Sequence, residues 1–196
     1  MKHPTAEVNS DAKLPDSVAV WQYAHIRERV EIGENCIIGR GVYIAPGVKI
    51  GDDCKVQNYA MKYEPAVLSE GVFIGPAVVL TNDECPRSIT PDGKLKTGQD
   101  WPAVGVTVKQ GATIVARSVC VAPVTIGART LVAAGSVVTC DIPVYALVSG
   151  VPARRIGWVG KAGVPLVKLE ENKCRCPQAG AIHLQTGPDA LVEKTV

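Results

Sequence analysis

The sequence predicts an all-β fold: a parallel β-helix of hexapeptide repeats with one extruded loop and a small C-terminal extension. The first observation is a column of aliphatic residues at every sixth position from Val8 to Leu80, which Lys62 alone interrupts. A second column, offset from the first by four residues, holds only small or β-branched residues. Third, glycine directly follows the aliphatic position at Gly33, Gly39, Gly51 and Gly75.

A period of six residues fits neither a helix nor the simple alternation of a strand, and it indicates an internal repeat. Each hexapeptide forms one short strand and then a corner, where glycine adopts an unusual backbone conformation easily. Three faces, about 18 residues, close one coil, and parallel coils stack about 4.8 Å apart. A different β-solenoid is the alternative that this pattern leaves open. The aliphatic column, which fills the interior, is Val8, Leu14, Val20, Ile26, Ile32, Ile38, Ile44, Ile50, Val56, Leu68, Ile74 and Leu80.

Composition and charge exclude several classes of function. Among 196 residues, 21 Lys and Arg against 19 Asp and Glu leave a net charge of +2, which gives no electrostatic case for binding nucleic acid or a membrane surface. We find no amino-terminal signal and no apolar run of membrane length. Cys36 and Cys54, two of seven cysteines, fall in the small interior column, where a thiol behaves as a small hydrophobe. We therefore expect a cytoplasmic protein with reduced thiols and no membrane insertion.

The repeat divides the chain into two parts. Residues 1–150 are expected to form the β-helix domain, with an inserted loop at about 81–105 that lacks the sixfold pattern and is rich in turn formers. Because the repeat resumes at Val108, 28 residues after Leu80 and not a multiple of six, the loop is a true insertion. Loops of this length are usually functional or disordered, and the charged and aromatic residues here favour a functional loop. Residues 151–196 are expected to form a C-terminal cap, built as a short helix or an extended arm, and a tail.

Residues 18 positions apart lie above one another in such a helix. This places Lys62 below Leu80, Glu64 below Asn82, and Tyr63 between them at the same edge. The single break in the aliphatic column therefore meets the point where the loop leaves, and irregularities of this kind often coincide with function. The alternative is that the Lys62 side chain extends past its neighbours into solvent.

Two further groups of residues bear on function. Ala116 and Ala134 fall one coil apart at equivalent corners, where small side chains would leave a groove for a long flexible ligand; ordinary corner packing is the alternative. Among the three histidines only His25 lies in the repeats, and the separations of 22 and 158 residues exclude one metal ion shared by all three. Cys174 and Cys176 with the nearby histidine lack a fourth ligand, so we expect no metal.

Beyond the hexapeptide columns, the chain carries six short motifs: Val56-Gln57-Asn58, Tyr63-Glu64, the segment 71–76, Leu80-Thr81-Asn82, Pro86-Arg87 and the segment 150–158. Together they resemble bacterial nucleotide-sugar N-acetyltransferases. The chain is most similar to the UDP-2-acetamido-3-amino-2,3-dideoxy-glucuronate N-acetyltransferases, with the dTDP-3-amino-3,6-dideoxyhexose N-acyltransferases close by. The resemblance covers about residues 3–165. It implies a left-handed β-helix, acetyl-CoA as co-substrate, and a homotrimer that binds CoA and the sugar nucleotide between subunits.

The resemblance also implies roles for individual residues. Asn82 matches the asparagine beside the sugar amine, and Ala116 and Ala134 match corner positions whose backbone holds the pantetheine arm of CoA. Arg154, with its neighbour Arg155, matches the basic segment that meets the CoA phosphate. The remaining candidates are His25 as the one possible base, and Lys62, Tyr63, Glu64 and Arg87 as substrate-binding residues at the sugar edge.

These expectations combine into one function: an acetyl-CoA-dependent N-acetyltransferase that acylates the amino group of a nucleotide-linked 3-amino sugar for cell-surface polysaccharide or glycan biosynthesis. A neutral amine is a good nucleophile, so orientation is the main task of such an enzyme. One alternative is an O-acetyltransferase acting on a sugar or on serine, which needs a strong base, and no histidine lies between residues 26 and 182. The other is a non-catalytic solenoid that binds a partner, in which the loop and Arg154 have no role.

Overall fold

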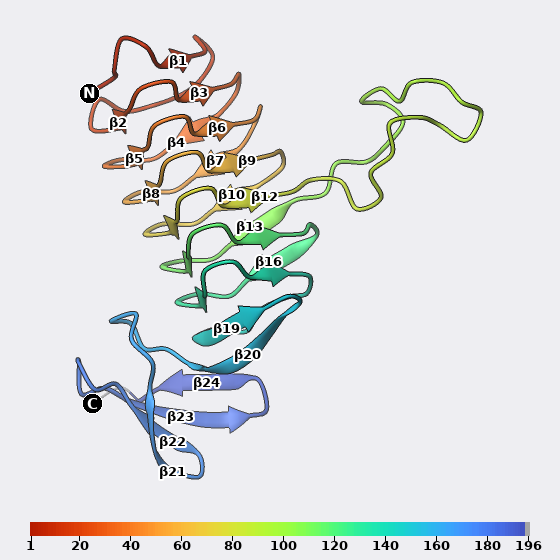
Figure 1. Cartoon of the computed structure of the whole chain (residues 1–196). Coiled ribbons are helices and arrows are strands. Elements are labelled where there is room, and N and C mark those ends of the chain that lie inside the picture. The colour runs from red at the N-terminus through yellow and green to blue at the C-terminus, as the bar shows by residue number, and fades with distance from the viewer. Residues whose placement is uncertain (195–196) are drawn as a thin grey trace.

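The computed structural model describes residues 1–194 and contains no helix in that range, so none that is long and apolar enough to span a bilayer. Short strands stack along one axis, from the amino terminus to a separate C-terminal sheet (Figure 1). Consecutive strands of the repeats belong to different sheets, and each pairs in parallel with a strand one coil away. The predicted all-β, parallel β-helix of hexapeptide repeats is confirmed, and the architecture agrees with the left-handed type.

Three sheets form the faces of the helix. The seven-stranded sheet contains β1 (Glu7–Val8), β3 (His25–Ile26), β6 (Tyr43–Ile44), β9 (Met61–Lys62), β12 (Val79–Leu80), β15 (Val119–Cys120) and β18 (Val137–Val138). The five-stranded sheet contains β4 (Glu31–Ile32), β7 (Lys49–Ile50), β10 (Val67–Leu68), β13 (Val106–Val108) and β16 (Val124–Ile126). The eight-stranded sheet contains β2 (Ala19–Val20), β5 (Ile37–Ile38), β8 (Lys55–Val56), β11 (Phe73–Ile74), β14 (Thr113–Ile114), β17 (Leu131–Val132), β19 (Ala146–Gly150) and β20 (Ala153–Trp158).

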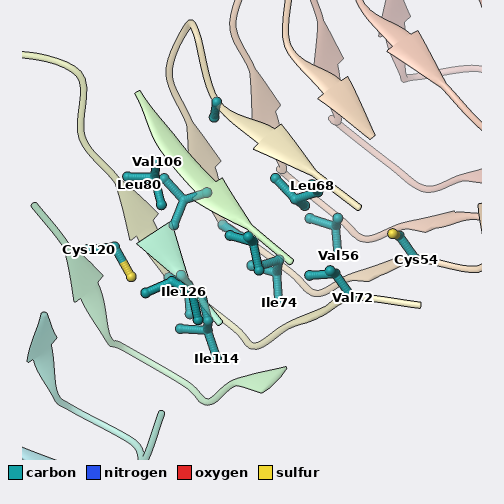
Figure 2. Close-up of a cluster of buried hydrophobic side chains, with 14 of the residues drawn as sticks. Cys54, Val56, Leu68, Val72, Ile74, Leu80, Val106, Ile114, Cys120 and Ile126 are labelled. Carbon is teal, nitrogen blue, oxygen red and sulfur yellow. The ribbon is translucent and has the colours of Figure 1, made fainter. Parts of the chain in front are cut away.

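The interior is built by the two columns that the sequence shows. In the two-residue strands after β1 the second residue is buried, while the first lies on the outer face. Figure 2 shows side chains from all three faces, among them Val56, Leu68 and Leu80, gathered between the sheets. Burying each aliphatic side chain contributes about 1.5–3 kcal/mol. Small residues such as Cys54 are equally buried, because they lie where two faces converge.

The inserted loop leaves the helix after β12 and returns at β13. In the coils before the insertion, strand partners lie 18 positions apart, as Tyr43 and Met61 do, but across the insertion Val67 pairs with Thr107, 40 positions later. The loop extends away from the side of the helix (Figure 1). The predicted extrusion is therefore confirmed, and the coils on either side of the insertion stack directly on each other.

From residue 151 to residue 194 the C-terminal region contains no helix, so the extended alternative for the cap is the correct one. β20 turns back along β19 in antiparallel orientation. The chain then forms an antiparallel C-terminal sheet of β21 (Val167–Glu170), β22 (Lys173–Arg175), β23 (Ile182–Gly187) and β24 (Ala190–Glu193). His183 is fully buried there, its ring 5.3 Å from that of Tyr145 in the last coil, and burial lowers its pKa. Glu193 receives a hydrogen bond from the Tyr145 hydroxyl (3.3 Å) and pairs with Lys161 (2.8 Å), so polar contacts join this sheet to the helix.

Candidate functional site

The base of the loop is the most constrained part of the candidate site. The Thr81 amide donates to the Cys120 carbonyl (3.0 Å), and the Thr81 hydroxyl accepts from the Ala122 amide (2.9 Å). The Val104 amide then donates to the Asn82 carbonyl (3.0 Å), which closes the loop at its neck. Asn82 is therefore held on the rigid scaffold. Its side-chain amide is half-buried and makes no hydrogen bond within residues 1–194, so it is free to bind a ligand.

Tyr63 and Glu64 lie directly below this neck, as the stacking of coils predicts. The Tyr63 amide points at the Leu80 carbonyl (3.4 Å), and both side chains are half-buried on the outer surface. The structure thus brings together Tyr63, Glu64 and Asn82 at one edge of the helix.

Lys62 is different, because its side chain points into the helix. It pairs with Leu80 as predicted, yet it is 0% exposed, and its ammonium has no hydrogen-bond partner within residues 1–194. Burial lowers its pKa to about 7. The alternative that Lys62 reaches solvent is therefore wrong, and from this position its ammonium cannot contact a ligand on the outer surface.

His25 lies on the same face as the loop exit but three coils nearer the amino terminus. From His25 the register runs through Tyr43 and Met61 to Val79, three coils or about 14 Å along the axis. Within one chain His25 and Asn82 therefore cannot act on the same atom.

An aromatic row, not anticipated from the sequence, connects the two regions. The ring of Tyr43 lies 5.6 Å from that of His25 and 5.6 Å from that of Tyr63. Arg27 approaches the Tyr43 hydroxyl (3.5 Å) while it pairs with Glu28 (2.9 Å). The same arithmetic of 18 residues that placed Tyr63 would have placed Tyr43 above His25.

Arg87 lies at the start of the projecting loop and is exposed. Its guanidinium donates to the neighbouring Pro86 carbonyl (2.9 Å). Farther out, Ile89 and Leu95 form an antiparallel bridge. The structure places Arg87 in the loop but shows no contact between it and the residues below the neck.

The two small corner residues are aligned as predicted. The Gly135 amide donates to the Ala116 carbonyl (2.9 Å), so Ala134 lies one coil above Ala116. Ala116 is half-buried and Ala134 is exposed. A Cβ added at Gly75 would lie 2.6 Å from the Ala116 nitrogen, so this corner also approaches the coil below closely. The result is a surface without bulky side chains at these two alanines.

Arg154 and Arg155 are adjacent in β20 but differ in their surroundings. Arg155 donates to the Pro188 carbonyl (2.7 Å), pairs with Asp189 (3.3 Å) and lies 4.3 Å above the Trp158 ring. These contacts commit its guanidinium to holding the β23–β24 turn. Arg154 is exposed and donates only to its neighbouring Ala153 carbonyl (2.9 Å). Of the pair, Arg154 is the one that is available to a phosphate.

The described part of the chain contains no group of three or more His, Cys, Asp or Glu side chains arranged to hold a metal ion. Cys174 pairs with His183 across β22 and β23, and Cys176 is buried.

Comparison with known proteins agrees with the fold. Residues 11–46 and 29–61 match the family described as bacterial transferase hexapeptide (six repeats). These two overlapping segments span 51 of the 196 residues and are similar to that family. The bifunctional protein GlmU of Nitratidesulfovibrio vulgaris is 33% identical to it over 135 residues, which make up 68% of this chain and 29% of that relative. This chain therefore spans less than a third of the length of this relative.

Solved structures share the fold. A hexapeptide-repeat-containing acetyltransferase from Vibrio cholerae, solved with acetyl coenzyme A, aligns with a TM-score of 0.57 and 24% identity, over 67% of this chain and 72% of that chain. A hexapeptide transferase family protein from Anaplasma phagocytophilum aligns with a TM-score of 0.55 and 18% identity, over 81% of each chain. At these identities the likeness is one of fold.

Proposed function

We propose that this protein is an acetyl-CoA-dependent N-acetyltransferase that acylates the amino group of a nucleotide-linked 3-amino sugar in polysaccharide or glycan biosynthesis. The observation that carries the proposal is the neck of the loop. It holds a free asparagine amide above Tyr63 and Glu64, with no histidine of the chain nearby. Such a site can orient an amine, and it offers no imidazole to deprotonate a hydroxyl.

The chemistry needs little from the protein. A sugar amine should titrate near an α-amino group, at about 8, so a useful fraction is neutral at physiological pH. The Asn82 amide oxygen accepts a hydrogen of that amine and directs its lone pair at the thioester carbonyl. As the C–N bond forms and the C–S bond breaks, the surplus proton passes from nitrogen to the departing CoA thiolate. A backbone N–H at a corner of the helix would stabilise the oxyanion.

In this proposal acetyl-CoA lies along the corner of Ala116 and Ala134. The absence of bulky side chains there lets the pantetheine arm lie against the backbone, and the free Arg154 can meet a CoA phosphate. Because Arg155 is committed to the β23–β24 turn, we assign the phosphate contact to Arg154 alone. The Vibrio cholerae protein, solved with acetyl coenzyme A, supports this choice of co-substrate.

A homotrimer is part of the proposal, with both substrates bound between subunits. The five-stranded sheet carries an exposed charged ladder of Lys13, Glu31 and Lys49, which suits solvent. The outer row of the seven-stranded sheet is more apolar and includes Met61 and Val79. We propose that the latter face packs against a second copy. Seven free cysteines fit a cytoplasmic location.

The alternatives differ in what they require. An O-acetyltransferase needs a base, and His25 could reach Asn82 only from another subunit, because about 14 Å separates them within one chain. A non-catalytic solenoid would not bind CoA. The test is to incubate the purified protein with acetyl-CoA and a panel of nucleotide-linked amino sugars and their hydroxyl analogues, following thiol release. We expect release with a 3-amino sugar only; release with a hydroxyl analogue, or no CoA binding at all, would overturn the proposal.

A further inference from the structure

Three successive turns at the corner between the eight-stranded and seven-stranded sheets carry an unusual set of side chains. They are Trp21-Gln22-Tyr23, Gly39-Arg40-Gly41 and Gln57-Asn58-Tyr59, and we call this surface the aromatic corner. The turns stack in register: the Gly41 amide donates to the Gln22 carbonyl (2.9 Å) and the Tyr59 amide to the Arg40 carbonyl (2.8 Å). They surround an open hollow of about 350 Å³ that includes Trp21, Arg40 and Asn58 in its lining.

The aromatic rings of this corner face solvent. Trp21 is 41% exposed, Tyr23 60% and Tyr59 53%, although burial of such rings is what normally stabilises a fold. The three turns contain no acidic residue. Arg40 lies 5.3 Å above the Tyr23 ring and forms no ion pair within residues 1–194. The corner thus combines flat apolar surface with one uncompensated cation.

Two glycines leave room for the Asn58 and Tyr59 side chains of the corner. A Cβ added at Gly41 would lie 2.6 Å from the Tyr59 ring, and one added at Gly39 would lie 2.6 Å from the Asn58 Oδ1 atom. The Asn58 and Tyr59 side chains therefore pack over the preceding coil. There the Asn58 Oδ1 atom also accepts a hydrogen bond from the Arg40 amide (2.9 Å). Tyr59 adopts a φ of 61°, a region that is unfavourable for a bulky residue. The same conformation recurs at other corners of the helix, for example at Tyr23 (φ 57°) and Ala77 (φ 54°), so it belongs to the turn and not to the ring.

We propose that the aromatic corner binds the nucleoside diphosphate portion of the sugar nucleotide, an inference that rests on the proposed function. The base stacks on the exposed Trp21 ring, and the side-chain amides of Gln57 and Asn58 pair with its polar edge. Arg40 contacts the diphosphate. Aromatic stacking with neighbouring amides is how proteins hold unpaired bases, and a guanidinium matches phosphate oxygens geometrically.

The position of the corner suits this role. The Trp21 turn lies two coils, about 10 Å along the axis, from the turn that contains Tyr59. Tyr59 and Glu64 lie at opposite ends of one hexapeptide, and five residues of extended chain span at most about 17 Å. Asn82 lies one coil above Glu64 at the far end. An extended nucleoside diphosphate sugar can cover that span, with its base at the aromatic corner and its amine at the neck of the loop.

The test measures binding of UDP, dTDP and GDP to the whole protein by calorimetry, without CoA. We expect Trp21→Ala and Arg40→Gln each to weaken binding of the preferred diphosphate about 10-fold to 100-fold. Ile156→Ala and Arg175→Gln, at exposed positions in the C-terminal region, are the matched controls and should bind as the wild type does. In steady-state assays the corner variants should raise KM for the sugar nucleotide and leave KM for acetyl-CoA unchanged.

The outcomes separate this inference from the proposed function. Loss of diphosphate binding in both corner variants of a protein that transfers no acetyl group would support the corner and refute the enzyme. Acetyl transfer by the wild type, with unchanged binding in both variants, would refute the corner alone. Failure of the wild type to bind any of the three diphosphates would also refute it.

Discussion

Replacing Lys62 should make the protein more stable, by an amount that depends on pH. The side chain is fully buried without a partner for its ammonium, and burial lowers its pKa from the ordinary 10.5 to about 7. Between these two values the unfolded chain binds more protons than the folded chain, so stability rises with pH across this window. At about 1.36 kcal/mol per pKa unit, the difference between the two pKa values corresponds to about 5 kcal/mol. Below pH 7 the free energy of unfolding is lower by this full amount than it is above pH 10.5.

The matched variants are Lys62→Met, which keeps the length of the side chain and removes the charge, and Lys55→Met, at an exposed outer position in the neighbouring strand β8. Urea unfolding at several pH values between 6 and 10 gives the free energy of unfolding of each protein. At pH 6 to 7 we expect Lys62→Met to exceed the wild type by several kcal/mol, up to about 5, and this advantage to shrink steadily towards pH 10. Lys55→Met should follow the wild type throughout.

The reasoning about Lys62 would be refuted if Lys62→Met were less stable than the wild type at pH 7. That result would mean that the ammonium has a partner in the folded protein. An advantage that does not change between pH 7 and pH 10 would also refute it, because the gain would then come from packing alone. Comparing two variants at each pH cancels the titration of other groups, which both share with the wild type.

The proposed mechanism and assembly give further expected results. Asn82→Ala should lower kcat about 100-fold, as removal of one positioned polar group does, whereas His25→Ala should be mild and keep the pH profile of the wild type; the reverse order would restore His25 as a base. Arg154→Ala should raise KM for acetyl-CoA with little change in kcat, because a phosphate contact binds ground and transition states alike, and an unchanged KM would remove it from the site. Arg155→Ala should leave that KM unchanged but increase protease cleavage of the C-terminal sheet, since it loses the contacts to Pro188 and Asp189. Sedimentation at micromolar concentration should show a trimer, and a monomer would refute the site between subunits.

The repeat made most of the fold predictable. An interior residue at every sixth position leaves the chain no alternative but to turn a corner after each short strand, and register then follows by counting. For that reason counting alone predicts that Tyr63 and Glu64 lie below the loop exit and that Leu80 pairs with Lys62. The corner alignment of Ala116 and Ala134 follows from the same count.

Side-chain direction was less predictable, because it depends on neighbours outside the repeat. Lys62 has room to point outwards or inwards by position alone, and only the packed interior shows that it points inwards. Arg154 and Arg155 look equivalent in sequence, yet the β23–β24 turn engages only one of them. That turn belongs to a sheet without sixfold periodicity, so its position could not be obtained by counting. The C-terminal strands likewise carried no pattern that separated a helix from an extended arm.

The way in which the loop is attached has a consequence for how such proteins can be altered. Val67 pairs with Thr107 as readily as Lys49 pairs with Val67, although very different lengths of chain connect the two pairs. The pairing of the coils therefore does not depend on the length of chain between β12 and β13, provided that the neck from Asn82 to Val104 is closed. Segments of other lengths and compositions can be grafted at this point without reshaping the scaffold. Substrate preference could in that way change independently of the apparatus that holds the coils together.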